Sequence, residues 1–431
     1  MYWYISFLRP PPVATANPAQ GITITPQVAN DLRTELRYEP TTISYLWQRL
    51  VPATSPPTPP TQLTIFEPPA STYKPITIPL PPLAKVGESW RLGLFSSGAS
   101  SKARGAEAGP SGKLLDLVQG PQILGVWSEG IQIIRPSGSG LTPGAVRGMG
   151  KQKETQPSSG AKGKNIKGNG KGKPEKDEGA KQGRIIREWA LPENEGSLRI
   201  VEQTSFDLDK KIWDSGLALS AWLWKYLPDP STLPSLGQRV LSLLTREEQL
   251  SILELGTGTG LVSIVLALAL RRRNLGREIT ATDLDSAIPL MDENIALNPI
   301  PPQPQSTEQA NAEPEVSPKV TLDAKVLDWD QPLPDWVVRD MPELVIAADV
   351  TYNTDSFPAL LSTLTCLLTP PKDEKHPLLI LAYKQRDLAE RDLWEMLKEK
   401  GIGMVLIDKV QGAEEGYGET EIWVGGYGLK A

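Results

Sequence analysis

Three glycines in alternate positions follow an apolar stretch in the second half of the 431-residue chain, and together they could hold a nucleotide-like ligand. The segment reads Ile252-Leu-Glu-Leu-Gly256-Thr-Gly258-Thr-Gly260-Leu-Val, so a short strand turns directly into a helix. Ligands on open parallel sheets bind beyond the carboxyl ends of the strands, where glycine lets the backbone approach them closely. The spacing is not that of a dinucleotide fingerprint, and no Gly-Lys-Ser/Thr of a phosphate loop follows. The alternative is a tight turn without a ligand.

Acidic and aromatic residues follow the next two expected strands. Asp283 and Leu284 end the second strand, where a carboxylate can accept hydrogen bonds from both hydroxyls of a ribose. Asp328 and Trp329 follow the third strand, and a carboxylate beside a flat ring suits the edge and face of an adenine. The alternatives are a helix cap, for which Asp285 is the better candidate, and a loop aspartate beside a core tryptophan.

The fourth strand ends in Ala347-Ala348-Asp349-Val-Thr-Tyr352, at the same edge of the sheet as the glycines. An aspartate and a tyrosine three residues apart can frame a pocket in which a nucleophilic amine meets an activated methyl group. The alternative is a helix cap followed by a buried tyrosine. The four strand ends together predict one ligand site.

Strands and helices alternate from residue 252 onward, which predicts an α/β fold. Buried apolar strands in βα repeats indicate a parallel sheet with helices on both faces, and the last two strands, joined by a short glycine-rich connection, indicate an antiparallel hairpin. We therefore expect a Rossmann-like, seven-stranded, mostly parallel sheet. The expected strands are 252–255, 279–283, 320–326, 344–349, 378–383, 404–410 and 420–427, and the expected helices are 215–227, 260–272, 286–297, 355–368 and 387–399.

Composition divides the chain into three parts, of which the first two make a low-complexity N-terminal half. Residues 1–95 are proline-rich with short strands, including a docked strand at the N-terminus and a helix-like piece at 28–36. Residues 96–182 are rich in Gly, Ser and Lys, which predicts a mostly disordered linker containing one hairpin, 123–127 with 131–134. Residues 183–431 carry the α/β pattern, begin with a hairpin of 185–189 and 198–202, and hold a proline-rich insertion at 299–318.

Five motifs in order resemble those of the seven-β-strand protein-lysine methyltransferases, the group called lysine methyltransferase family 16 or methyltransferase-like 21. The glycine segment, preceded by Glu254, resembles motif I of class I methyltransferases. The resemblance covers more than half of the chain, and the long N-terminal extension fits a fungal type. The motifs are Ile212-Trp213-Asp214-Ser215-Gly216, the glycine segment with Thr282-Asp283, Asp328-Trp329, Asp349-Val-Thr-Tyr352 and Ala382-Tyr383-Lys384-Gln-Arg386.

The resemblance implies a cofactor, S-adenosyl-L-methionine, and a protein substrate carrying the target lysine, in the class of elongation factors or chaperones. By resemblance Trp213 lines the cofactor site, and Asp349 with Tyr352 lies at the substrate lysine as the catalytic pair. Asp349 would orient the ammonium, while apolar surroundings favour the neutral amine. The expected cofactor-binding residues are Trp213, Glu254, Gly256, Thr257, Gly258, Gly260, Asp283, Leu284, Asp328, Trp329 and Ala348.

Charge and composition limit the other classes. A net charge of −6 and a pI near 5.3 argue against a whole-protein footprint for nucleic acid or an anionic membrane. The single cysteine, Cys366, and single histidine, His376, exclude a disulfide framework and a Cys/His zinc site. No uncharged apolar run reaches the length of a membrane span. We expect a monomeric protein of the cytoplasm, with the nucleus as a second location, and no metal.

Two alternative functions stay open. The same fold could methylate a small amine or RNA, although the Asn/Asp-Pro-Pro-aromatic motif of base-amine methyltransferases is missing after the fourth strand. A non-catalytic scaffold is the other alternative, with the lysine-rich stretch 151–181 binding RNA or a partner. That stretch holds nine Lys and four acidic residues without interleaved aromatics, which is more typical of a solvated spacer.

Overall fold

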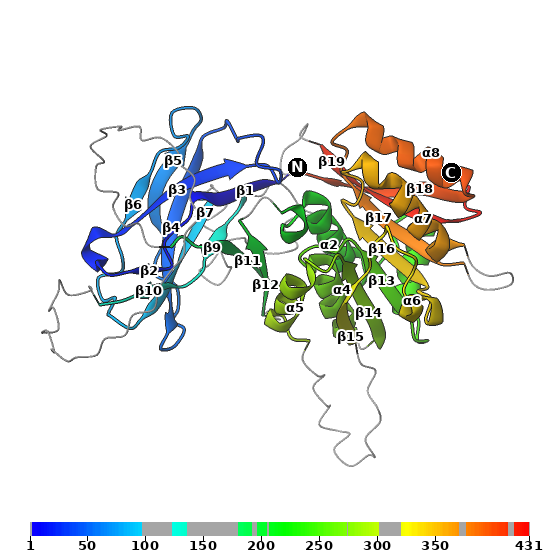
Figure 1. Ribbon diagram of the computed structural model, residues 1–431, viewed down its shortest axis with the longest axis horizontal. Helices are drawn as coiled ribbons and strands as arrows, with labels where there is room; N and C mark the ends of the chain where they lie inside the picture. The colour runs from blue at the N-terminus through cyan, green and yellow to red at the C-terminus, as the bar shows by residue number, and fades with distance from the viewer. Residues whose placement is uncertain are drawn as a thin grey trace, which may run out of the picture.

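The structure is a computed structural model that describes residues 2–96, 123–135, 180–191, 196–204, 207–273, 275–300, 320–369, 376–412 and 418–430. A β-rich part and an α/β part lie side by side, with β11 (Arg184–Ala190) and β12 (Ser197–Gln203) between them (Figure 1). Most of the predicted linker, 96–182, and nearly all of the insertion, 299–318, fall outside the described residues. The linker prediction therefore stays a prediction.

The N-terminal part consists of two sheets. The first has the order β6-β3-β1-β8, and the second the order β12-β11-β9-β7-β10-β2, with β4 paired to β7 and β5 to β4. The low-complexity description therefore does not extend to residues 2–96, which contain strands of up to 11 residues. The strands are β1 (Trp3–Arg9), β2 (Ala14–Thr15), β3 (Ile22–Ala29), β4 (Thr41–Val51), β5 (Thr61–Phe66), β6 (Ile76–Ile78), β7 (Ser89–Ser96), β8 (Ile123–Leu124), β9 (Val126–Ser128) and β10 (Ile131–Ile133).

Local predictions in this part have mixed outcomes. The docked N-terminal strand is confirmed as β1, which pairs with β3 and β8. The helix-like piece at 28–36 is wrong, because Val28 and Ala29 pair with β1 and the Asn30 side chain closes a tight turn by accepting hydrogen bonds from the N–H groups of Thr34 and Glu35. The predicted hairpin at 123–134 is also wrong, because β9 and β10 each pair with β7 instead of with each other.

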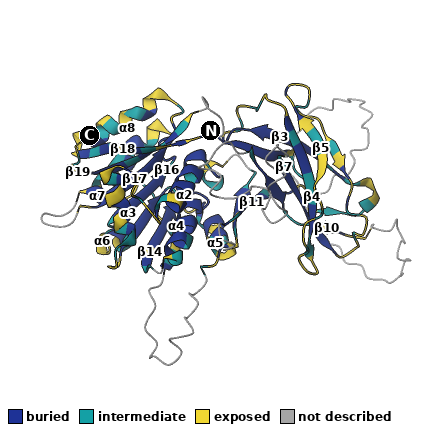
Figure 2. Cartoon of the chain, turned by 180° about the vertical axis from the view of Figure 1, so that it is seen from behind, coloured by how far each residue is buried: buried dark blue, intermediate teal, exposed yellow. Residues whose placement is uncertain are grey.

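The α/β part is built on a seven-stranded sheet of order β15-β14-β13-β16-β17-β19-β18. Its first five strands are parallel and its last two antiparallel, which confirms the predicted architecture. The central strands are dark over most of their length in Figure 2, since helices cover both faces. The strands are β13 (Ser251–Leu255), β14 (Arg277–Asp283), β15 (Val320–Val326), β16 (Leu344–Ala348), β17 (Leu378–Tyr383), β18 (Ile402–Gln411) and β19 (Glu419–Tyr427).

The helices of the α/β part pack their apolar residues against the sheet and against one another. All six residues of β17 are buried, and α4 buries nine of its twelve residues against the sheet and α2. None of the helices in the described ranges combines the length and apolar content that a membrane crossing requires. The helices are α2 (Asp214–Tyr226), α3 (Ser235–Thr245), α4 (Leu261–Arg272), α5 (Ile288–Leu297), α6 (Asp335–Arg339), α7 (Phe357–Leu368) and α8 (Asp392–Glu399), of which α3 and α6 were not predicted.

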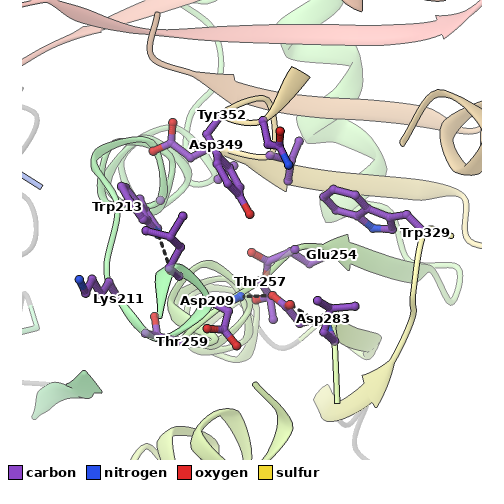
Figure 3. Close-up of a pocket in the computed structure, with 18 of the residues that line it drawn as sticks. Asp209, Lys211, Trp213, Glu254, Thr257, Thr259, Asp283, Trp329, Asp349 and Tyr352 are labelled. Carbon is purple, nitrogen blue, oxygen red and sulfur yellow. Dashed lines mark hydrogen bonds between the residues drawn. The ribbon is translucent and has the colours of Figure 1, made fainter. Parts of the chain in front are cut away.

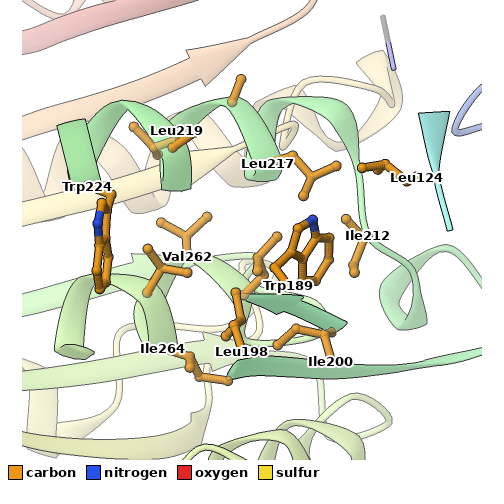
Figure 4. Close-up of a cluster of buried hydrophobic side chains, with 14 of the residues drawn as sticks. Leu124, Trp189, Leu198, Ile200, Ile212, Leu217, Leu219, Trp224, Val262 and Ile264 are labelled. Carbon is orange, nitrogen blue, oxygen red and sulfur yellow. The ribbon is translucent and has the colours of Figure 1, made fainter. Parts of the chain in front are cut away.

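The two parts share one hydrophobic core. The predicted hairpin of β11 and β12 is confirmed. Because β11 also pairs with β9, this hairpin belongs to the N-terminal sheet. Trp189 of β11, Leu124 of β8 and Leu217 of α2 are fully buried in the same cluster (Figure 4). Such packing rigidly joins the β-rich part to the helix that precedes the glycine segment.

Candidate functional site

A cavity of about 260 Å³ opens at the carboxyl ends of β13, β14 and β16. The predicted site residues line it from four strand ends and from the segment before α2 (Figure 3). Gly260 is the exception, because a side chain at its Cα would point at Met291 and Ile264 instead of into the cavity. The predicted residues in the lining are Trp213, Glu254, Gly256, Thr257, Gly258, Asp283, Leu284, Asp328, Trp329, Ala348, Asp349 and Tyr352.

The glycine segment turns through left-handed backbone, which explains its composition. Gly256, Gly258 and Gly260 have φ of +60°, +59° and +83°. A Cβ on Gly256 would lie 3.0 Å from Val350 and 3.3 Å from the ring of Trp329. Only glycine fits both the conformation and the space. The backbone therefore forms the floor of the cavity beneath Trp329.

Glu254 holds the start of α4 in place. Its carboxylate accepts hydrogen bonds from the backbone N–H of Ser263 (3.0 Å) and from the Ser263 hydroxyl. Ser263 lies in the first turn of α4, whose N–H groups have no partner within the helix. Burial raises the pKa of Glu254 to about 7, although the hydrogen bonds from Ser263 oppose that shift. Glu254 thus fixes the glycine segment against the helix.

Asp283 lies at the tip of β14, beside the glycine segment. Its two oxygens accept hydrogen bonds from the N–H groups of Gly258 (2.8 Å) and Leu284 (2.7 Å). Burial raises the pKa of Asp283, against the lowering effect of these two bonds. Asp285 is exposed and does not line the cavity, which agrees with the choice of Asp283 as the ligand-facing carboxylate.

Asp349 lies buried in the wall of the cavity, and both of its oxygens are bonded. They accept from the Ser215 N–H (2.9 Å) and hydroxyl (2.6 Å), and from the Arg386 guanidinium at 2.7 and 3.1 Å. Asp349 itself has φ of +56°, a strained conformation for a residue with a side chain. The neighbours thus hold the carboxylate in one orientation. Its direct role toward an acceptor amine stays a prediction.

Trp213 and Tyr352 form a parallel aromatic pair above Asp349. Their ring centroids are 6.5 Å apart with an interplanar angle of 6°, and the Arg386 guanidinium carbon lies 5.4 Å from the Trp213 ring centroid. Tyr352 is 52% exposed, so this end of the cavity reaches the surface. Burial and the charges of Asp283 and Asp209 raise the pKa of Tyr352, which keeps its hydroxyl neutral.

Residues outside the predicted site set complete the lining. Asp209 accepts a hydrogen bond from the Ser286 hydroxyl (2.8 Å), and its carbonyl oxygen lies 3.3 Å from the position of a Cβ on Gly258. No periodic pattern marked this segment, since it contains only a three-residue 3-10 helix, η4 (Leu208–Lys210), between β12 and α2. The unpredicted lining residues are Leu208, Asp209, Lys211, Ile212, Gly216, Thr259, Leu261, Val262, Leu327, Asp330, Val350, Asn353, Ser356 and Ala359.

The sheet order and the glycine-floored cavity define a Rossmann-like α/β domain. Residues 192–400 match the family model described as lysine methyltransferase. Relatives include mouse protein N-lysine methyltransferase METTL21A (36% identity, 26% of this chain and 42% of the relative) and mouse EEF1A lysine methyltransferase 3 (31%, 41% and 56%). Another is Saccharomyces cerevisiae protein-lysine N-methyltransferase EFM6 (31%, 34% and 54%). The chain spans about half the length of the curated relatives it matches.

Proposed function

We propose that the protein is an S-adenosylmethionine-dependent protein-lysine N-methyltransferase. The supporting observation is that one cavity brings together the glycine floor, Asp283 and Trp329 with Asp349 and Tyr352. The first three suit an adenosyl group, Tyr352 lies where the cavity reaches the surface, and Asp349 lies buried in the cavity wall. The proposal extends to a monomeric enzyme of the cytoplasm whose substrate is an elongation factor or a chaperone. The similarity to EEF1A lysine methyltransferase 3 supports the first of these substrate classes.

The cavity residues fit the cofactor by their chemistry. Asp283 presents carboxylate oxygens that accept from ribose hydroxyls, and Asp328 is an acceptor for an exocyclic amine beside the half-buried ring of Trp329, which stacks on a base. Gly256 leaves the space that a side chain would fill beneath that ring. When bound, S-adenosylmethionine would supply its methyl group: attack of a neutral amine on the methyl carbon would break the carbon–sulfur bond and release S-adenosylhomocysteine. The remaining work of the protein is alignment and control of charge.

The acceptor side must admit a lysine side chain and stabilise its uncharged form. A free lysine has a pKa near 10.4 and is almost wholly protonated at neutral pH. The rings of Trp213 and Tyr352 attract an arriving ammonium through their faces, each worth about 1 kcal/mol, and a low-polarity surrounding then favours loss of the proton to solvent. Asp349 lies next to this route with its carboxylate fixed by Ser215 and Arg386.

Calorimetric titration with S-adenosylhomocysteine tests the cofactor assignment. We expect Asp283→Ala to weaken binding by at least about 30-fold, because two charge-assisted hydrogen bonds are lost. Asp285→Ala is the matched control, since it removes an exposed carboxylate two residues away, and it should bind as the wild type does. Equal affinity in the two variants would refute the role of Asp283, and no binding by the wild type would refute the cofactor assignment.

Incubation of the purified protein with radiolabelled S-adenosylmethionine and a cell extract tests the acceptor. We expect the label in a protein band, and acid hydrolysis of that band should yield methylated lysine. Label in the RNA or in the small-molecule fraction instead would replace the lysine reading with one of the alternative acceptors.

A further inference from the structure

A buried cluster of charged residues connects the β-rich part to the wall of the cavity. Three carboxylates, Asp31, Asp214 and Asp349, surround the cations of Lys384 and Arg386. All five side chains are 14% exposed or less, and those of Asp31 and Asp214 are fully buried. Asp31 is the member that comes from the N-terminal part, and it lies 355 positions before Arg386 in the sequence.

The turn after β3 presents Asp31 rigidly. The main-chain bridge between Ala29 and Leu36 closes the turn, and the Asn30 side chain crosses it to bond Thr34. The Leu32 N–H donates back to the Asp31 carboxylate (2.9 Å). Because the Asp31 carboxylate is already ordered, orienting a partner side chain costs it little further conformational entropy.

Asp31 and Asp349 both accept hydrogen bonds from the guanidinium of Arg386. Arg386 donates from Nη2 to Asp31 (2.8 Å) and uses both Nη atoms for Asp349 (2.7 and 3.1 Å). The planar fork of arginine transmits orientation from one carboxylate to the other, as a lysine could not. The same guanidinium lies over Trp213, so its position bears on both the aspartate and the aromatic pair.

The ionisation of the cluster agrees with this arrangement. Burial acts to raise the pKa of Asp31, but Lys384 and Arg386 outweigh it and hold that pKa below its usual value. Burial and the charge of Asp31 raise the pKa of Asp214. Asp214 accepts hydrogen bonds from the Tyr2 N–H (3.0 Å) and the Tyr4 hydroxyl (2.8 Å), both at the N-terminal end of the chain. Asp214 also accepts from Lys384 Nζ (2.6 Å), while the Asp31 carboxylate faces Arg386 (2.8 Å).

We propose that Asp31 is a positioning residue for methyl transfer: it holds Arg386 so that Asp349 and Trp213 keep the geometry the acceptor amine requires. The N-terminal β-rich part is therefore a component of the catalytic centre. This inference rests on the proposed function for its activity readout, but its structural readout does not.

Asp31→Asn is the informative variant, because it keeps the size and hydrogen-bonding oxygen and removes the charge. Glu188→Gln is the matched control, since Glu188 forms a buried ion pair with Arg91 (2.8 Å) inside the N-terminal sheet and does not line the cavity. We expect Asp31→Asn to lower the saturating rate of label transfer by about 10-fold or more, with S-adenosylhomocysteine affinity within about twofold of the wild type. Glu188→Gln should cost comparable thermal stability and leave the rate per folded molecule unchanged. Rates that fall equally in both variants would overturn the proposal, as would a loss confined to cofactor affinity.

Hydrogen exchange of the Ser215 amide gives a readout that does not need activity. That N–H lies in the first turn of α2 and is bonded to Asp349 at 2.9 Å, so its exchange reports the position of the carboxylate. We expect exchange at least about 10-fold faster in Asp31→Asn than in the wild type and unchanged in Glu188→Gln. Unchanged exchange in Asp31→Asn overturns the positioning role even if the wild type methylates no protein. Should that variant not fold, Asp31→Ser also removes the charge, with a smaller side chain, and wild-type exchange in it overturns the role equally.

Discussion

The side-chain amide of Asn294 in α5 donates a hydrogen bond to the backbone carbonyl oxygen of Thr259, inside the glycine segment, at 2.9 Å. The same side chain accepts from the N–H of Val201 (2.8 Å) and donates to its carbonyl (3.1 Å), as a neighbouring strand would. One fully buried residue therefore covers the edge of β12 and anchors the floor of the cavity. The N-terminal sheet and the cofactor side of the site are coupled through it.

Asn294→Ala should therefore lower both stability and cofactor affinity. It leaves three buried backbone groups without partners, at a cost of about 3 kcal/mol in the free energy of unfolding. Asn298→Ala is the control, because Asn298 bonds the N–H and carbonyl of Arg199 one turn further along and makes no bond to the glycine segment. In urea denaturation we expect similar losses for both, whereas S-adenosylhomocysteine affinity should fall about 10-fold only for Asn294→Ala. Equal affinities would show that the Thr259 bond does not shape the site.

Glu254 predicts a specific dependence of stability on pH. Its pKa of about 7 in the folded protein lies above the ordinary value of 4.5, so the folded state binds the proton more tightly. The resulting stabilisation is complete below about pH 4.5 and is lost as the pH rises through 7, about 3 kcal/mol in all. Glu254→Gln removes the titration, and its unfolding free energy should decline less than that of the wild type between about pH 5 and pH 8. Parallel declines in the two proteins would contradict a raised pKa.

Gly256→Ala separates strain from steric exclusion. The new Cβ would meet Val350 and the Trp329 ring as well as a left-handed backbone, and we expect cofactor affinity to fall at least about 10-fold. Gly428→Ala has the same backbone problem, with φ of +71°, but no atom within 4 Å of the new Cβ. It should lose about 1 kcal/mol of stability and keep full affinity. Retention of affinity by Gly256→Ala would mean that the floor under Trp329 is not the base site.

Asp349→Asn tests the acceptor side alone. Asparagine tolerates the left-handed backbone of this position but cannot balance the charge of Arg386, so the acceptor geometry should loosen while the cofactor contacts remain. We expect turnover to fall about 100-fold with unchanged S-adenosylhomocysteine affinity. Asp355→Asn, at an exposed carboxylate in the following turn, serves as the control for that turn. Normal turnover in Asp349→Asn would remove Asp349 from the proposed mechanism.

The sequence predicted the α/β part and the strand-end residues of the cavity for a physical reason. Apolar strands of a parallel sheet place their carboxyl ends at one edge, so polar residues after each strand must meet there. Asp283 and Trp329 could be assigned in this way without knowledge of the helices between them. Gly260 was misassigned because its spacing matches the motif, whereas its Cα faces Met291 beneath the helix start.

Contacts between distant segments could not be predicted from local patterns. Nothing near Asp31 marks its partner Arg386, because the turn that carries it resembles a helix in apolar spacing and becomes a turn only through pairing of β3 with β1. The hairpin of β11 and β12 was predicted, but its sheet was not, since its partner β9 lies before a long stretch of different composition.

The pairing of Ile185 and Ile186 with β9 has a practical consequence. A fragment starting at Gly183 would carry a two-stranded ribbon with one bare hydrogen-bonding edge, and would open Asp214 and Lys384 to water by removing Tyr2, Tyr4 and Asp31. Such an edge recruits further copies of itself. The α/β half is thus not an independent unit, and transferring it to another protein would require the N-terminal β-rich part as well.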